Sequence, residues 1–415
     1  MKRIIFNRHK AWLKKERRIV FLSVFTGLVI TLFCYVMGNS VLPLPGETQI
    51  LKDFDDFKEL TGLQRGNVPD SILLINVCYD KALVDYEENG MPVGKTVITD
   101  REKLLKLLTI AKEADNYRYI FLDVHFDESL ETPFDSALFQ TIASMDRIVI
   151  PSHKDANLKD SILLPKAANA DYTTTWKVVS FSRYLFLHDD ELSVPLKMYV
   201  DRKHLYGSGI KKHLGGLWYS DGGRLCQNGV TLMMPVAVYG SLIDKEGHER
   251  ERNYIYLGSD LLEEDYPVEE QIDDKILVIG DFKNDIHLTY QGNQPGSAIC
   301  VNAYIALMNG DHLIKWGYVL VFFLIYSIVG SFYLSGKSFS YLFKNPWLGV
   351  LMSFFSTATL FFVVATVAKW NGVVFNMWVP TTVYSLIDTY VQKRNLYKTK
   401  KYEKVINNRS SKPVG

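Results

Sequence analysis

Carboxylate and imidazole side chains follow several apolar runs of this sequence, and such side chains together can hold a divalent cation or a cationic ligand. The stretch ILVIGDFKNDIH, residues 276–287, predicts a buried strand that breaks at Gly280 into a polar loop. In parallel α/β sheets, ligands bind beyond the carboxyl ends of the strands. The predicted ligand-binding residues are therefore Asp80, Asp123, Asp127, His153, Asp281, Asp285 and His287.

Two other interpretations of these residues stay open. Acids at strand ends often cap helices or pair with lysines, so the group could be a structural polar rim, with His125 leaving its strand for packing reasons. An extracytoplasmic enzyme would need a recognisable catalytic motif in addition to these acids, but the sequence has no GxSxG, HExxH, Walker or GxGxxG pattern. We therefore expect no enzyme and no cofactor, and we leave the choice of metal open.

The elements that would position these residues alternate between strand and helix. Apolar runs at 71–79, 119–126, 147–153 and 275–280 predict buried strands. Helical periodicity predicts helices over 101–114, 134–145 and 297–310, the first opened by a capping box of Thr99 and Glu102 and the last ended by Gly310. This succession predicts an α/β domain with a mostly parallel sheet. Residues 171–270 predict a β-rich insertion, in which 193–200 fits either a strand or a helix, and a polar loop is expected after the first strand.

Four further segments are apolar enough to suggest transmembrane helices. The first covers 19–37, and the others cover 316–334, 347–368 and 372–391, with residues 369–371 as a tight hairpin between the last two. Asp388 interrupts the last span, either near its cytoplasmic end, where it reaches water, or as a functional intramembrane acid. Gly38-Asn39-Ser40 also fits a signal-peptide cleavage site, so the first span is either retained or removed.

Basic residues predict the orientation of the chain. Residues 1–18 carry eight Lys or Arg against one acid, and the tail at 392–415 is equally basic, which places both ends in the cytoplasm. The domain at 38–315 would then lie outside a bacterial cytoplasmic (inner) membrane, in the periplasm or its equivalent. This domain has 28 basic and 43 acidic residues, a net charge of −15, whereas the whole chain has +1. Such a charge disfavours nucleic acid and favours cations or basic partners.

The four cysteines, Cys34, Cys78, Cys226 and Cys300, show no CxxC spacing or paired framework. We therefore expect free, mostly buried thiols and no disulfide scaffold.

Three blocks of the sequence resemble the second class of CHASE domains, which are extracytoplasmic sensory modules of bacterial cyclases and histidine kinases. The block YRYIFLDVHFDESLETPFDSALFQTIASMDRIVIP places Asp123, Phe126 and Asp135 on the family pattern. The block DKILVIGDFKNDIHLTYQGNQPGSAICVNAYIALMNGD adds Gly280, Asp285, Pro295, Gly296 and Asn302, and ITDREKLLKLL adds Arg101. The resemblance covers most of residues 71–311 and implies a sensory domain with one leading span and about three trailing spans.

We therefore expect a multi-pass receptor subunit without its own output domain. It would bind a small molecule, a cation or an envelope protein outside and signal through a linker, represented by Gly310, Asp311 and Lys315, to a cytoplasmic or membrane partner. The alternative is a structural membrane component of an envelope assembly. The lipid bilayer is a partner in both cases, and a homo-oligomer fits both.

Overall fold

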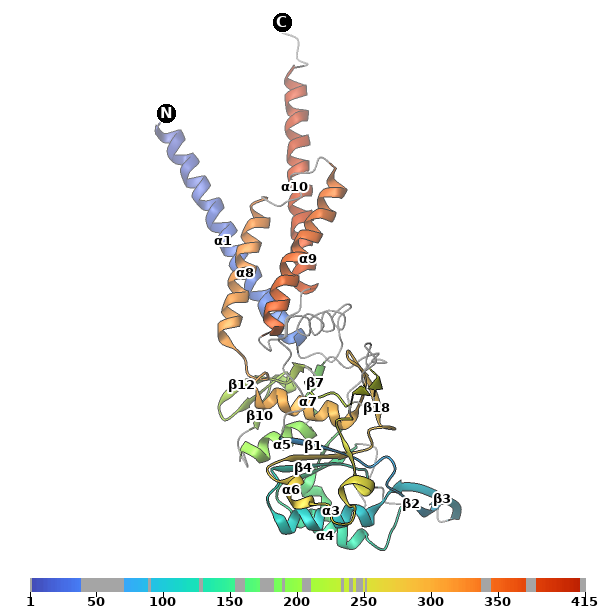
Figure 1. Cartoon of the computed structure of the whole chain (residues 1–415). Coiled ribbons are helices and arrows are strands. Elements are labelled where there is room, and N and C mark those ends of the chain that lie inside the picture. Colours follow the sequence, from blue (N-terminus) through green and yellow to red (C-terminus); the bar gives the residue numbers. More distant parts are fainter. Residues whose placement is uncertain are drawn as a thin grey trace. The chain divides into compact units, whose positions relative to one another are not determined.

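A computed structural model describes most of the chain, namely residues 2–38, 71–88, 91–126, 130–153, 161–171, 183–188, 191–203, 210–232, 235–238, 242–243, 249–250, 252–336, 345–370 and 378–410. The chain divides into two compact units. One is helical and combines residues 1–40 with 314–415, and the other is the globular unit of residues 41–313 (Figure 1).

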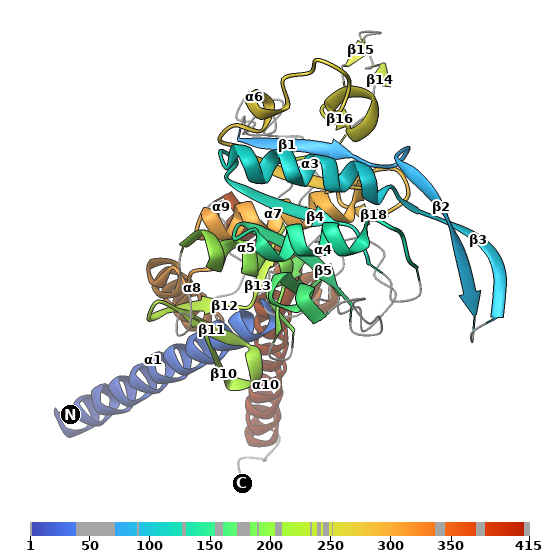
Figure 2. The ribbon, with the colours of Figure 1, turned by 90° about the horizontal axis from the view of Figure 1, so that it is seen from below.

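A parallel sheet forms the centre of the globular unit (Figure 2). Every pair of neighbouring strands in it is parallel, which confirms the predicted α/β fold. The order across the sheet is β16 (Ile255–Tyr256), β1 (Ile72–Asn76), β17 (Ile276–Gly280), β4 (Tyr119–Asp123), β5 (Ile148–Ser152) and β6 (Ala167–Asn169).

Successive residues of the central strands point into two different hydrophobic cores, as the pleat of a strand requires. Leu277 and Ile279 of β17 pack with α3 (Arg101–Ala114) and α4 (Asp135–Ser144), whereas Ile276 and Val278 pack with α5 and α7. Helix α5 covers Val194–Lys203 and α7 covers Gly296–Met308. Helices therefore cover both faces of the sheet, which explains why its strands read as continuous apolar runs (Figure 2).

The sequence located the end of one predicted helix correctly and the start of another with an error of one residue. Asp100, rather than Thr99, caps α3, because its carboxylate accepts hydrogen bonds from the backbone N–H groups of Glu102 and Lys103. The predicted capping box is thus wrong by one residue. Gly310 does end α7, with a φ of 74° and backbone hydrogen bonds from Gly310 to Leu307 and from Asp311 to Ala306.

The expected polar loop after the first strand is instead a β-hairpin. Strand β2 (Lys81–Glu88) pairs antiparallel with β3 (Met91–Thr99), and residues 89–90 between them lie outside the described ranges. Asn89 and Gly90 form the dipeptide most typical of tight hairpins, a signal that was available in the sequence.

Short antiparallel strands confirm the predicted β-rich insertion, and α5 shows that residues 193–200 are mostly helical. Its strands are β7 (Arg183–Leu185), β8 (Leu187–His188), β9 (Glu191–Leu192), β10 (Ile210–His213), β11 (Trp218–Asp221), β12 (Arg224–Gln227), β13 (Gly229–Thr231), β14 (Leu242–Ile243) and β15 (Glu249–Arg250). A π-helical turn (Leu257–Leu261), α6 (Val268–Ile272), β18 (Ile286–Thr289) and β19 (Gly292–Pro295) complete the globular unit, with short 3₁₀ turns at Ser161–Lys166 and Leu214–Gly216.

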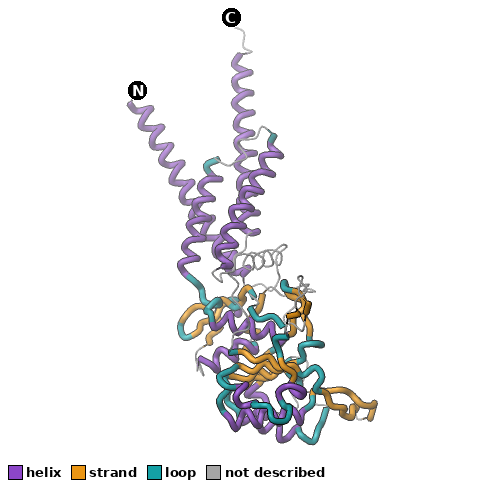
Figure 3. The backbone as a smooth tube through the Cα atoms, viewed as in Figure 1, coloured by secondary structure: helices purple, strands orange, loops and turns teal. Residues whose placement is uncertain are grey.

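The helical unit contains α1 (Lys2–Gly38), α8 (Trp316–Leu334), α9 (Pro346–Trp370) and α10 (Trp378–Ser410) (Figure 3). Among the described residues, Glu16–Met37 and Trp316–Leu334 are long and apolar enough to cross a membrane. Lys369 and Trp370 still belong to α9, so the tight hairpin predicted there is wrong, and residues 371–377 are outside the described ranges. The predicted basic tail is largely helical, because α10 continues to Ser410.

The predictions for the cysteines and for Asp388 can be compared directly with the structure. All four cysteines are free and buried, as expected. Asp388 is buried within the helical unit, with 1% of its surface exposed, so the expectation that it reaches water is wrong. Gln392 donates a hydrogen bond of 3.0 Å to one of its carboxylate oxygens.

Candidate functional site at the carboxyl edge of the sheet

The parallel register brings the predicted residues to one edge of the sheet. Asn76 of β1, Gly280 of β17 and Asp123 of β4 lie in line at the ends of adjacent strands. Asp281 follows Gly280 directly, and Asp80 follows β1 by a short turn. The predicted gathering at this edge is therefore confirmed for these strands, while Asp127 lies outside the described residues.

Asp80 and Asp281 each form an ion pair with a lysine. Lys103 of α3 donates to Asp80 at 2.6 Å, and Lys81 donates to Asp281 at 2.8 Å. Burial alone would raise the pKa of Asp281, but the hydrogen bonds from Lys81 and Asn284 outweigh it and lower the pKa. These two acids fasten α3 and the start of the β2–β3 hairpin to the sheet, as the polar-rim interpretation predicts.

Asp123, Asp285 and His287 form a second group at the same edge. His287 Nε2 lies 3.0 Å from Asp285 Oδ1, and this hydrogen bond raises the pKa of His287. Burial, followed by the nearby charge of Asp285, raises the pKa of Asp123 to about 7, although His287 opposes the shift. A carboxyl group that titrates near neutral pH beside an Asp–His pair is a recurring feature of functional sites.

The backbone at the start of α7 leaves room for this group. A Cβ atom on Gly296 would overlap Asp285 Oδ2 and come within 3.3 Å of His287 Nε2. The Asp285 carboxylate thus lies at the amino end of α7, where a negative charge is stabilised by the helix dipole. The neighbouring Ser297 hydroxyl is buried and makes no hydrogen bond among the described residues.

His153 has different neighbours. Its Nδ1 atom lies 2.9 Å from Asp171 Oδ1, and its ring meets that of His125 edge-on with centroids 5.6 Å apart. The structure therefore pairs His153 with Asp171 just after β5 and brings its ring against His125 of the segment after β4.

Several residues on the quoted CHASE pattern are buried and structural. The Arg101 guanidinium donates to Asp135 Oδ1 at 2.6 Å and lies over the ring of Phe126, 5.4 Å from its centroid. Asn302 of α7 is fully buried; its side chain accepts from Val236 N at 2.9 Å and donates to Val236 O at 2.6 Å. These contacts hold α3 to α4 and the insertion to α7.

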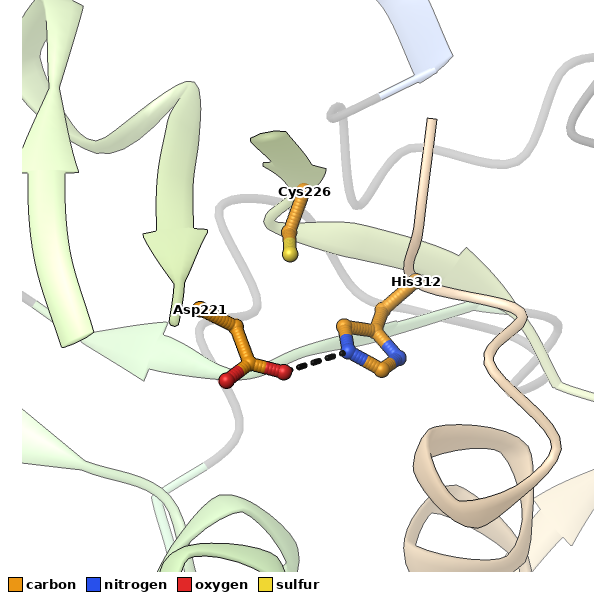
Figure 4. A group of neighbouring side chains, drawn as sticks. All are labelled: Asp221, Cys226 and His312. Atoms are coloured by element: carbon orange, nitrogen blue, oxygen red, sulfur yellow. Dashed lines mark ion pairs between the residues drawn. The ribbon is translucent and has the colours of Figure 1, made fainter. Parts of the chain in front are cut away.

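The sequence analysis missed a third group, in which Asp221, Cys226 and His312 point toward one another (Figure 4). Their potential ligand atoms all lie within 4.8 Å of one another, and all three residues are buried. Asp221 and Cys226 come from the β11–β12 hairpin, and His312 follows α7. The sequence DGG before Arg224 signalled the hairpin turn, but nothing in the sequence linked it to His312.

A hydrogen-bonded Asp–His pair beside a carboxyl group of raised pKa can exchange protons. Comparisons with protein-family models, curated proteins and solved structures gave no match for this chain.

Proposed function

We propose that this chain is a membrane-anchored receptor subunit, whose acidic globular unit binds a ligand or envelope partner outside and whose helices transmit the signal to a cytoplasmic partner. One observation carries the proposal, namely the way in which the chain leaves the globular unit. The segment after α7 is fixed to the rest of the globular unit. Only two residues separate the end of this fixed segment from the start of the apolar helix α8.

The hold on this segment is made by backbone hydrogen bonds to the insertion. Gln227 N donates to His312 O at 2.8 Å, and Leu313 forms an isolated antiparallel bridge with Cys226. Asp311 N donates back to Ala306 of α7. Ile314 and Lys315 then lead to α8, whose first turn uses the Lys315 carbonyl as an acceptor from Tyr318. A displacement of α7 or of the insertion would therefore pull on α8 through a very short connection.

The apolar helices and the charge pattern support a membrane setting. The proposal places α1 and α8, together with α9 and the first part of α10, across a bacterial cytoplasmic membrane. The basic residues before Ile19 and after Gln392 keep both chain ends in the cytoplasm. The exposed lysines and arginine of α10 then offer a cationic helix to an acidic partner.

The ligand would bind at the group of Asp123, Asp285 and His287. A small cationic molecule suits this group, because the Asp123 and Asp285 carboxyl groups are close enough to influence each other electrostatically. The rise of the Asp123 pKa to about 7 makes such binding dependent on pH, since a cation must displace the proton of Asp123.

A structural role in an envelope assembly is the second candidate. The β2–β3 hairpin favours it, because Leu83, Met91, Val93 and Val97 are each more than half exposed. An exposed apolar strand face of this kind suits a fixed contact with another protein.

Quantitative mass spectrometry of proteins that co-purify with the tagged chain from mildly solubilised membranes distinguishes the two. The test variant replaces Lys393, Arg394, Lys398 and Lys400 with Gln, which removes charge and keeps a helix-compatible residue in α10. The control replaces exposed Lys211 and Lys212 of the globular unit with Gln. A cytoplasmic signalling protein lost only from the α10 variant supports the receptor. Stoichiometric envelope partners unaffected by the α10 changes support the structural role.

A further inference from the structure

The β11–β12 hairpin and the segment after α7 bring three different metal-ligating side chains together. In the hairpin, Tyr219 pairs with Cys226 and Asp221 pairs with Arg224. Because alternate residues of a strand share a face, Asp221 lies on the same face as Tyr219 and Cys226. Gly222 and Gly223, with φ values of 53° and 85°, make the tight turn that keeps the two strands in this register. His312 completes the group from the other side (Figure 4).

The distances within this group suit a shared metal ion as well as an ion pair between His312 and Asp221. His312 Nε2 lies 3.5 Å from Asp221 Oδ2, which is too long for a good hydrogen bond. Two ligands of one tetrahedral zinc ion are roughly 3.3–3.7 Å apart, because metal–ligand bonds are about 2.0–2.3 Å long. The separation of these two atoms therefore lies within the range for two ligands of one metal ion, and the three potential ligand atoms all lie within 4.8 Å of one another.

The surroundings of the group contain unsatisfied polar atoms, which is unusual in a protein interior. Both ring nitrogens of His312 and the Tyr219 hydroxyl are buried and lack a hydrogen-bond partner among the described residues. The His312 ring is instead held by packing: it stacks on Tyr219, with ring planes 5° from parallel, and contacts Tyr199 edge-on. Packing thus orients the ring with Nε2 toward Asp221, and neither nitrogen makes a good hydrogen bond among the described residues.

Asp221 has two further polar neighbours. The Tyr199 hydroxyl donates to Asp221 Oδ2 at 2.8 Å, and Arg224 lies 3.4 Å from the same oxygen with its own side chain largely exposed. The Cys226 thiol donates a hydrogen bond of 3.4 Å to the Arg224 carbonyl oxygen. A bound divalent ion would displace the thiol proton to solvent and form a metal–thiolate bond in its place.

We propose that Asp221, Cys226 and His312 bind one divalent transition-metal ion of the zinc class. A thiolate, an imidazole and a carboxylate together select zinc or cobalt over magnesium and calcium, which prefer oxygen ligands alone. Three protein ligands leave a fourth position for water. The ion would fasten the segment that contains His312 to the β11–β12 hairpin, and the proposal holds whether or not the chain is a receptor.

Cobalt titration of the full chain in detergent, after removal of metal with a chelator, tests the site. The folded wild-type protein should bind one equivalent of Co²⁺, with tetrahedral d–d bands and a thiolate-to-cobalt charge-transfer band, and Zn²⁺ should abolish both. Cys226→Ser should lose the charge-transfer band, whereas Cys300→Ser, a change at another buried thiol, should keep it. His312→Gln should weaken Co²⁺ binding at least tenfold.

Three results would overturn the proposal. One is a folded wild-type protein that binds no Co²⁺ or gives no thiolate band, a result that does not depend on how any variant folds. Another is a thiolate band that survives in Cys226→Ser with native circular dichroism. The last is a band lost from Cys300→Ser while that variant is folded, which would place the metal at Cys300.

Discussion

Arg101 and Asp135 form a buried ion pair of 2.6 Å that joins the first turns of α3 and α4. Only 2% of the Arg101 side chain and 9% of the Asp135 side chain are exposed. Asp135 also accepts a hydrogen bond from the Thr132 hydroxyl, and Phe126 and Phe139 pack against the guanidinium. The pair therefore connects three segments of one core.

We predict that Arg101→Met destabilises the globular unit by about 3–5 kcal/mol, because it leaves the Asp135 carboxylate buried without its partner. Urea unfolding of the full chain in detergent measures the effect. Arg118→Met is the matched control, since Arg118 pairs with Asp274 at the surface and should cost no more than about 1 kcal/mol. Equal losses in the two variants would show that the buried pair has no special role.

Asp123 should make the globular unit less stable as the pH rises. Its folded pKa of about 7 exceeds the unfolded value, so the stabilisation from the extra proton is complete below about pH 4, declines as the pH rises from about 4 to 7, and is absent above that range. Asp123→Asn stays neutral, and we expect it to be more stable than the wild type at pH 8 by on the order of 2–4 kcal/mol. His287, whose pKa is also raised, should keep part of the pH slope in the variant.

Asp281→Asn is the control for this experiment, because the stability contributed by Asp281 should change with pH in the opposite direction. The folded pKa of Asp281 is lowered, so its contribution to stability is present above the unfolded pKa and is lost as the pH falls through the folded pKa. This variant should be less stable than the wild type at pH 8. Unfolding curves from pH 5 to 8 in which Asp123→Asn follows the wild type would refute the assignment of Asp123.

Asn302→Ala should loosen the attachment of the insertion to α7. The change leaves the Val236 N–H and C=O groups without their partner, at a cost of about 1–3 kcal/mol for each buried group. Hydrogen exchange of the Val236 amide should accelerate at least tenfold, while the amide of Leu277 in β17 should be unchanged. Unchanged protection of Val236 would mean that other contacts hold the insertion.

Gly296→Ala should disturb the Asp285–His287 pair, because the new Cβ atom would occupy the position of Asp285 Oδ2. The pKa of His287 should fall toward its ordinary value as the hydrogen bond with Asp285 weakens. NMR titration of His287 measures this change, and Ser297→Ala at the next position is the control, with a smaller expected effect. An unaltered His287 titration would place the carboxylate elsewhere.

The sequence was sufficient to predict the four central strands of the sheet, but not its edge strands β6 and β16 or the partners of its polar residues. The run before Gly280 is apolar at every position, since both faces of β17 are covered, and such runs are easy to recognise. The roles of Asp80 and Asp281 were not predictable in the same way. Asp281 is held by Lys81, which lies 200 residues earlier in the chain, so only the folded register reveals that its charge is already balanced.

The missed elements had local causes. The β2–β3 hairpin mixes charged residues, which are concentrated in β2, with Gly and Pro in β3, and therefore reads as a polar loop, although the Asn89-Gly90 dipeptide was a usable signal. Cys226 looked like an isolated cysteine, because His312 approaches it only through the segment after α7.

Cysteine accessibility in oriented membranes tests the central claim most directly. Single cysteines at Tyr79 of the globular unit and Tyr397 of α10, which are 64% and 71% exposed, would be labelled with a membrane-impermeant maleimide in right-side-out vesicles. The wild-type chain is the control, since its four thiols are buried. The receptor proposal predicts that Tyr79→Cys is labelled at once and that Tyr397→Cys is labelled only after the vesicles are opened. Labelling of both positions, or of Tyr397→Cys alone, in sealed vesicles would contradict it.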